Sequence, residues 1–169
     1  MARRVLSKIL NGPIIHGVSL YDNIKGYEWT TCFPEYGIML GGTPRKGFFA
    51  ANHETICGVI NMCDESHDET DLEILNLPTI DSKEPTLQYL QQAMQFIETC
   101  LQNNPQKFVY IHCRAGVSRS AEICVAWLCY KFSKTPVEAY QILHAKRPQV
   151  KPKCYNRPNI IEFCSQNVS

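Results

Sequence analysis

The stretch FVYIHCRAGVSRSAEICVAWLCY, residues 108–130, decides the fold. It begins with apolar strand formers, as is typical of a strand buried at the centre of a sheet. After Cys113 comes a turn that contains Gly116, and Arg119 then opens an apolar segment that is long enough for a buried helix. The stretch therefore predicts a strand, a short loop and a helix, with a cysteine at the point where the strand ends.

Length and composition define the class of protein around this stretch. The chain has 169 residues, 44% of them hydrophobic, which predicts one domain with a sizeable core. Its formal net charge of +1 does not favour nucleic acid as a partner, and no apolar run has the ~20 residues of a membrane span. The nine cysteines are odd in number and lack Cys-x-x-Cys spacing. They predict a reducing compartment rather than a disulfide framework or structural zinc.

The first 28 residues form an N-terminal segment ahead of the domain, which we expect to span residues 29–169. The segment contains Arg3, Arg4 and Lys8, has no acid before Asp22, and carries apolar residues at helical spacing. This composition fits a short helix docked on the domain, and it also fits a mitochondrial targeting sequence. We expect a cytoplasmic protein, with a mitochondrial one as the alternative.

The rest of the chain alternates between expected strands and expected helices. Strands are expected at residues 37–42, 55–62, 72–78 and 107–112, and helices at residues 85–105, 120–132, 135–148 and 157–166. The third helix begins with a capping box, in which Thr135 is the N-cap, Pro136 the first helical residue and Glu138 the third. This order predicts a single α/β domain with a central, mostly parallel sheet of about four to five strands flanked by helices.

The loop that follows Cys113 has the features of a phosphate-binding site. Its residues are Arg114, Ala115, Gly116, Val117 and Ser118. Because the loop joins a central strand to a buried helix, it lies at the sheet edge where α/β proteins bind ligands. Gly116 lets the backbone N–H groups turn toward one point, and the Arg119 guanidinium can bind two phosphate oxygens. A cysteine below these groups ionises readily, and its thiolate is a nucleophile aimed at phosphorus.

Residues 112–120, HCRAGVSRS, resemble the His-Cys-x-x-Gly-x-Ser-Arg-Ser signature of the dual-specificity branch of the cysteine-dependent protein phosphatases. The resemblance covers nearly all of the chain after residue 29 and includes GIMLGGTP (37–44) and GVINMCDE (58–65). It implies hydrolysis of phosphomonoesters through a phosphocysteine intermediate, without a cofactor or a metal ion. The roles that it implies are nucleophile for Cys113, phosphate binding for Arg119, stabilisation of the leaving thiolate for Ser120, tuning of the cysteine for His112 and general acid for Asp81.

A proton donor is also expected from the chemistry, because the expulsion of an alkoxide from phosphorus requires one. The donor should lie on a loop at the same sheet edge as Cys113, and Asp81 follows the strand expected at residues 72–78. Glu84 is the nearest alternative, but it adjoins a helix start, where an acid interacts favourably with the helix dipole. We therefore favour Asp81. Solvated loop charges are expected at Asp64, Asp68 and Asp71.

Three functions remain open on these residues. The first is a phosphatase that acts on phosphotyrosine and phosphoserine/threonine proteins, the second a phosphatase that acts on a phospholipid, and the third a non-catalytic phospho-binding module. Residues 85–98 and the basic N-terminus resemble an atypical mitochondrial group of the family that hydrolyses phosphatidylglycerophosphate. Val117 resembles the protein-directed members instead, and Arg114 is the remaining cation of the loop, so we favour protein substrates over phosphatidylglycerophosphate or phosphoinositides. A nucleophile together with an acid argues against a binding module.

Cys63 follows the strand expected at residues 55–62, which in this fold lies beside the strand that ends at Cys113. Some family members, among them inositol-lipid phosphatases, carry a cysteine in this strand and use it as a redox partner of the nucleophile. The resemblance thus implies a regulatory disulfide, which would rescue an oxidised nucleophile. The alternative is that Cys63 only packs beneath the loop. Cys124 is a further thiol, but it lies one turn inside the buried helix and is expected to point away.

Overall fold

The structure is a computed structural model that describes residues 30–64 and 70–167. The N-terminal segment expected at residues 1–28 lies outside the described residues. In chain order the elements are β1 (Thr30–Phe33), the 3-10 helix η1 (Pro34–Tyr36), β2 (Ile38–Gly41), α3 (Phe48–Asn52), β3 (Ile56–Asn61), β4 (Glu73–Asn76), α4 (Leu87–Asn103), β5 (Phe108–His112), α5 (Arg119–Phe132), α6 (Pro136–Lys146), α7 (Lys153–Asn156) and α8 (Pro158–Asn167). All four expected strands and all four expected helices are present, and β1, η1, α3 and α7 are additional.

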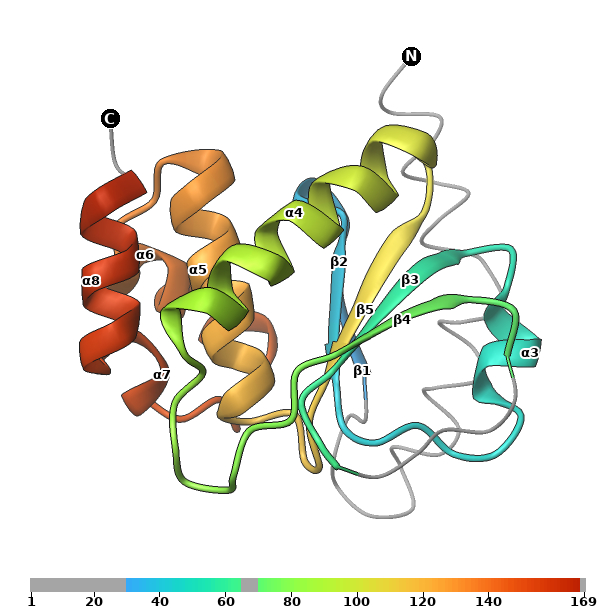
Figure 1. The fold of residues 1–169 in the computed structure, drawn as a ribbon, viewed down its shortest axis with the longest axis horizontal. Coiled ribbons are helices and arrows are strands. Elements are labelled where there is room, and N and C mark those ends of the chain that lie inside the picture. The colour runs from blue at the N-terminus through green and yellow to red at the C-terminus, as the bar shows by residue number, and fades with distance from the viewer. Residues whose placement is uncertain (1–29, 65–69, 168–169) are drawn as a thin grey trace.

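The five strands form one sheet in the order β1-β2-β5-β3-β4. β1 is antiparallel to β2, and all other neighbours are parallel. The predicted central, mostly parallel sheet is therefore confirmed, and β5 lies in its middle (Figure 1). The strand that ends at His112 is the fifth rather than the fourth along the chain, because residues 30–33 add an edge strand.

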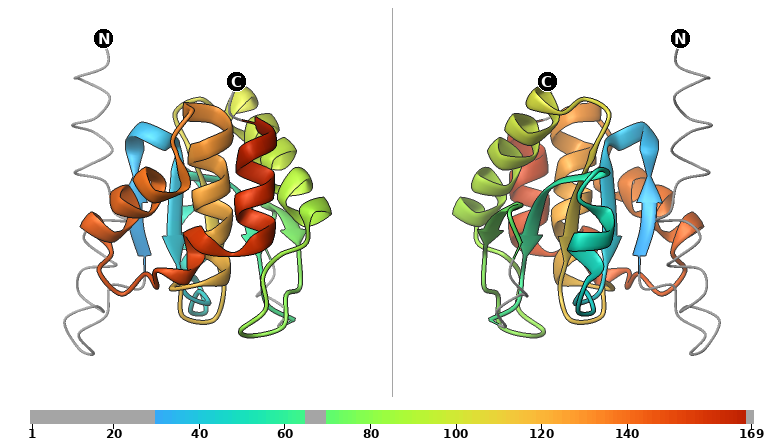
Figure 2. Two further views of the ribbon diagram at one scale, coloured as in Figure 1. Left: turned by 90° about the vertical axis from the view of Figure 1, so that its left-hand side faces the viewer. Right: turned by 90° about the vertical axis from the view of Figure 1, so that its right-hand side faces the viewer.

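Helices cover the two faces of the sheet unequally. α4, α5, α6 and α8 lie on one face, and the short α3 lies on the other (Figure 2). The larger core cluster lies between the sheet and α4, α5 and α8, and it includes Trp127, which is 1% exposed. A smaller cluster beneath α3 contains Phe49 and Tyr110. The whole first part of α5, from Arg119 to Cys129, is buried, which is the environment expected for a helix that is apolar on all sides.

Side-chain hydrogen bonds cap the N-terminal ends of α4 and α6. The Thr86 hydroxyl accepts a hydrogen bond from Tyr89 N at the start of α4. The capping box predicted for α6 is confirmed, because the Thr135 hydroxyl accepts from Glu138 N and the Glu138 carboxylate accepts from Thr135 N. Such caps contribute about 1 kcal/mol each. No helix within residues 30–64 and 70–167 has the length and apolar character needed to cross a membrane.

Candidate active site

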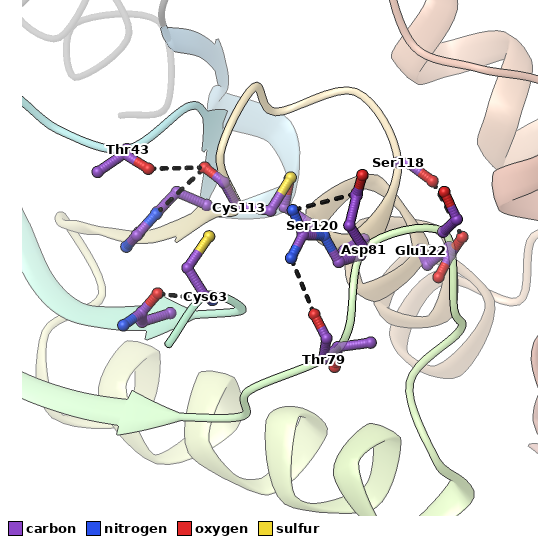
Figure 3. Close-up of polar contacts among 12 residues, drawn as sticks. Thr43, Cys63, Thr79, Asp81, Cys113, Ser118, Ser120 and Glu122 are labelled. Atoms are coloured by element: carbon purple, nitrogen blue, oxygen red, sulfur yellow. Dashed lines mark hydrogen bonds and ion pairs between the residues drawn. The ribbon is translucent and has the colours of Figure 1, made fainter. Parts of the chain in front are cut away.

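The phosphate loop, residues 113–118, leaves the carboxyl end of β5 at the centre of the sheet (Figure 3). Cys113 is only 2% exposed at its start, whereas Arg114 and Ala115 are exposed at its rim. Gly116 has a φ of 66°, and a Cβ atom at this position would lie 2.4 Å from the carbonyl carbon and oxygen of Gly41. Glycine is therefore required here both by the backbone conformation and by the close approach of β2.

A buried arginine binds the outer side of the phosphate loop. Arg147, 1% exposed at the end of α6, donates from Nε to Gly116 O at 2.8 Å and from Nη2 to Ala115 O at 3.2 Å. Its Nη1 also donates to Thr31 Oγ1 in β1. Because these carbonyl groups point toward Arg147, the loop N–H groups can point to the opposite side. No pattern in the sequence predicts this role, because the contacts join residues that are more than thirty positions apart.

The Cys113 thiol lies among groups that stabilise its ionised form. The Ser120 hydroxyl is 3.2 Å from Cys113 Sγ and donates a hydrogen bond to it. Burial by itself would raise the pKa of Cys113, but the Ser120 hydroxyl, the backbone N–H groups of Ser120 and Gly116 and the Arg119 charge together hold the pKa below its usual value of 9.0. A thiolate is therefore favoured at the floor of the loop.

His112 supports the loop from the last position of β5. Its ring is fully buried and stacks on Tyr110, with 5.5 Å between the ring centroids. Its Nδ1 lies 3.4 Å from the Cys113 carbonyl oxygen, which also accepts from the Thr43 hydroxyl at the same distance. The backbone of the nucleophile is thus fixed from the strand side.

Arg119 and Asp81 form an ion pair beside the phosphate loop. Arg119 Nη2 lies 3.3 Å from Asp81 Oδ1, and Arg119 Nη1 donates to Thr79 O at 2.8 Å. Arg119 is 8% exposed, and its Nε is buried without a hydrogen-bond partner among the described residues. The Asp81 side chain is 84% exposed. The structure therefore brings the predicted acid to the predicted phosphate-binding arginine.

Glu84, the alternative acid, contacts the start of α8. Glu84 Oε2 accepts from Asn159 N at 2.9 Å, so that the Glu84 carboxylate lies at the first turn of α8. Such a place favours a carboxylate through the helix dipole. Asp64 and Asp71 are exposed, and Asp68 lies outside the described residues. Among the candidate carboxylates within the described residues, Asp81 is the one that forms an ion pair with Arg119.

Cys63 lies at the carboxyl edge of β3, next to β5. The pairing of Asn61 with His112 brings the two strand ends together, and Cys63 is 6% exposed in the same core cluster as Cys113. Its N–H donates to Asn61 Oδ1 at 2.8 Å. Cys124 is fully buried in α5, and burial holds its pKa well above 9.0, so it remains a thiol. Of the two cysteines, Cys63 is the one at the strand edge that Cys113 shares.

Together these groups can bind an anion above a nucleophile. Backbone N–H groups and Arg119 supply donors for the phosphate oxygens, Cys113 supplies the thiolate, and Asp81 supplies a carboxyl group on the open side. Within the described ranges the structure shows no cluster of three or more His, Cys, Asp or Glu side chains that could hold a metal ion. The arrangement can place a thiolate below a bound anion, as the sequence predicted.

Comparison with known proteins identifies relatives that cover most of the domain. Residues 46–166 match the dual specificity phosphatase catalytic domain family. Human dual specificity protein phosphatase 16 is 32% identical over 105 residues, which are 62% of this chain and 15% of that protein. The tyrosine-protein phosphatase YVH1 of Saccharomyces cerevisiae is 32% identical over 94 residues, which are 46% of this chain and 26% of that protein. The chain thus spans about a quarter or less of the length of these two relatives.

Solved structures superpose on nearly the whole described domain. PTPMT1 in complex with PI(5)P is 26% identical, with a TM-score of 0.67 over 82% of this chain and 96% of that chain. Human DUSP28 is 18% identical, with a TM-score of 0.66 over 82% of this chain and 94% of that chain, and it supports the fold alone. Since the family match includes the loop from Cys113 to Ser118 and well over half of the sequence, this chain belongs to the dual specificity phosphatase catalytic domain family.

Proposed function

We propose that this protein hydrolyses phosphomonoesters through a phosphocysteine intermediate, with phosphotyrosine and phosphoserine/threonine proteins as its substrates. The observation that carries the proposal is the position of Cys113 Sγ at the floor of the phosphate loop, 3.2 Å from the Ser120 hydroxyl and next to Arg119. A thiolate held in this way is placed below the phosphorus atom of a phosphate bound by the loop.

In the first step, the Cys113 thiolate attacks phosphorus, the S–P bond forms and the ester P–O bond breaks. The leaving oxygen takes a proton from Asp81, which therefore starts the step protonated. The Arg119 guanidinium is next to the loop and can turn from Asp81 and Thr79 to two phosphate oxygens. Its buried, unpartnered Nε would gain an acceptor in this way.

In the second step, water attacks the phosphocysteine and passes a proton to the Asp81 carboxylate. The S–P bond breaks, inorganic phosphate forms, and the Ser120 hydroxyl stabilises the leaving Cys113 thiolate by the hydrogen bond that it already donates. Because turnover needs thiolate and protonated acid together, kcat/KM should have a bell-shaped pH dependence with an acidic optimum.

The surroundings of the loop support a protein substrate. Relatives at 28% to 32% identity are named as dual specificity or tyrosine-protein phosphatases. Val117 is half-buried in the loop, and Arg114 is the cation on its exposed rim. We therefore expect a cleft that admits phosphoserine and phosphothreonine side chains as well as phosphotyrosine.

A phospholipid is the second candidate substrate, supported by one comparison. PTPMT1 is 26% identical to this chain and its structure was solved in complex with PI(5)P. Kinetics on four substrates separate the candidates: a phosphotyrosine peptide, a phosphothreonine peptide, and phosphatidylglycerophosphate and PI(5)P in detergent micelles. We expect both peptides to be hydrolysed, the phosphotyrosine peptide faster, with Cys113→Ser as the inactive control. A kcat/KM about tenfold higher on either lipid than on both peptides would favour the lipid function instead.

The place of action is proposed as the cytoplasm, with mitochondria as the alternative. The basic composition of residues 1–10 supports the alternative. A fluorescent protein fused to the C-terminus of the full chain, compared with the same fusion lacking residues 2–10, separates the two. Mitochondrial fluorescence that is lost with residues 2–10 would establish the targeting role.

A further inference from the structure

The acid loop, residues 79–85, is held in place mainly by polar contacts. Ile80 is 74% exposed and the Asp81 side chain 84% exposed, so neither fixes the loop by packing. A turn closes through Lys83 N, which donates to Ile80 O, and Ser82 has a φ of 67° at the third position of that turn. A serine seldom adopts this conformation without support from its surroundings.

Two arginines contact the acid loop at different residues. Arg119 binds Thr79 O and the Asp81 carboxylate. Arg157 Nη2 donates to Ser82 O at 2.8 Å. Asn159 adds a hydrogen bond from Nδ2 to Pro85 O at 3.0 Å. The carbonyl that Arg157 binds belongs to the residue directly after the proposed acid.

Arg157 is in turn held by a buried carboxylate. Glu122 lies in the first turn of α5 and is fully buried. Its Oε1 accepts from the Ser118 hydroxyl at 3.3 Å and forms an ion pair with Arg157 Nε at 3.6 Å. Neither Glu122 Oε2 nor Arg157 Nε has a hydrogen-bond partner among the described residues. Burial of a carboxylate is costly, and pairing with Arg157 and Ser118 offsets that cost, so a gain in stability does not by itself explain this glutamate. Its geometry is instead that of a link between phosphate loop and acid loop.

Substrate binding changes the balance between the two sets of contacts. A phosphate in the loop requires the Arg119 guanidinium, whose donors then leave Thr79 O and Asp81. From that moment the contact of Arg157 with Ser82 O is the remaining arginine contact of the acid loop in the described structure. Since a displacement of about 1 Å can lower a rate 10²-fold, this contact matters for proton transfer.

We propose that Arg157, held by Glu122, is a positioning residue that keeps Asp81 above Cys113 through the Ser82 carbonyl once Arg119 has turned to the phosphate. The inference rests on the proposed function, because it takes Asp81 as the acid. It adds two residues that contact neither the phosphate nor the nucleophile.

The test compares two substrates whose leaving groups differ in their need for a proton. A phosphothreonine peptide releases an alkoxide and needs the acid, whereas difluoromethylumbelliferyl phosphate releases a stable aryl anion. The readout is the ratio of kcat/KM for the peptide to kcat/KM for the aryl phosphate. This ratio does not depend on the fraction of folded enzyme, so a less stable variant still gives a valid result.

We expect Arg157→Gln to lower this ratio about tenfold, and Glu122→Gln to lower it about threefold because the Arg157 side chain remains. Lys83→Gln is the matched control, since it removes a cation from the exposed surface of the same loop. It should leave the ratio unchanged. Competitive inhibition by inorganic phosphate should stay within about twofold in Arg157→Gln and Lys83→Gln, because the contacts of these two side chains lie outside the phosphate loop.

The Asp81→Asn background separates the possible failures. If Asp81→Asn lowers the ratio and Arg157→Gln lowers it no further in that background, both residues act on the same step and the inference is supported. This inference alone is overturned if Arg157→Gln leaves the kcat/KM ratio unchanged, whether both kcat/KM values fall equally or neither falls, while Asp81→Asn lowers the ratio. An unselective Asp81→Asn variant overturns the acid assignment in the proposed function and this inference with it.

Discussion

The phosphate loop and the acid loop lie at the same edge of the sheet, but they are held in different ways. The phosphate loop is buried at Cys113 and Gly116 and receives contacts from Gly41 in β2, Ser120 in α5 and Arg147 at the end of α6. The acid loop is exposed from Ile80 to Lys83, and its contacts include a few hydrogen bonds and one ion pair. The difference fits the proposed roles, because a nucleophile needs one fixed environment and a general acid has to meet different leaving groups.

The largest effect is expected at the floor of the phosphate loop. Cys113→Ser should lower kcat by about 10⁴-fold or more, because a serine hydroxyl is not ionised in this site. Phosphate binding measured by calorimetry should persist, since the loop N–H groups and Arg119 are unchanged. Substantial turnover by this variant would rule out the covalent intermediate.

A second prediction tests how rigidly the phosphate loop is built. Gly116→Ala should lower kcat/KM about 10²-fold, because its Cβ would meet the Gly41 carbonyl at 2.4 Å and displace the loop. Gly47→Ala is a matched control: Gly47 also has a positive φ, 79°, but no atom lies within 4 Å of the added Cβ. The control should lose about 1 kcal/mol of stability and keep its activity. Equal activity losses in both variants would show that backbone strain, and not the contact with β2, is responsible.

A third prediction concerns stability at the link between the two loops. Burial raises the pKa of Glu122 to about 7, against the opposing charges of Arg157 and Lys153, while the charge of Glu84 adds to the rise. The folded protein therefore binds this proton more tightly than the unfolded chain, and the free energy of unfolding should fall as the pH rises from about 4.5 to 7. The Glu122 contribution to that fall is roughly 3–4 kcal/mol at most.

The measurement is urea unfolding of the wild type and of Glu122→Gln at several pH values between 4.5 and 8. The wild type should lose stability relative to the variant over this range, because glutamine does not titrate. Parallel curves for the two proteins would mean that the Glu122 carboxylate is not buried as the structure places it. Glu122 would then not link the phosphate loop to the acid loop.

The smallest effect is expected for oxidation at the neighbouring strand. We propose that Cys63 forms a disulfide with Cys113 after mild peroxide treatment, because both lie at the shared edge of β3 and β5. Peptide mapping under non-reducing conditions should find the bond, and dithiothreitol should restore activity. Irreversible loss of activity should be a few-fold faster in Cys63→Ser than in the wild type. Equal rates in the two proteins would leave Cys63 with a packing role only.

Several features of this protein follow from the sequence alone because their determinants are local. One continuous stretch of sequence forms the strand, loop and helix around Cys113, and the capping box of α6 needs only Thr135 and Glu138. α4 could be placed from its periodicity, and α5 from its uniformly apolar sequence. The short strands β2 and β4 could be placed because a glycine turn and a proline follow them. β1, α3 and α7, which have four or five residues each, were not predicted.

The tertiary structure decided which distant side chains support the site. Arg147 meets the phosphate loop because α6 ends beside it, and Glu122 meets Arg157 because α5 packs on α7 and α8. In the sequence, Glu122 is one polar residue in an apolar helix, and Arg157 only opens an expected helix. Local patterns report which element a residue belongs to, whereas the partner of a buried charge depends on how the elements pack. The position of Cys113 between a central strand and a buried helix could therefore be predicted from the sequence, but the support of the acid loop could not.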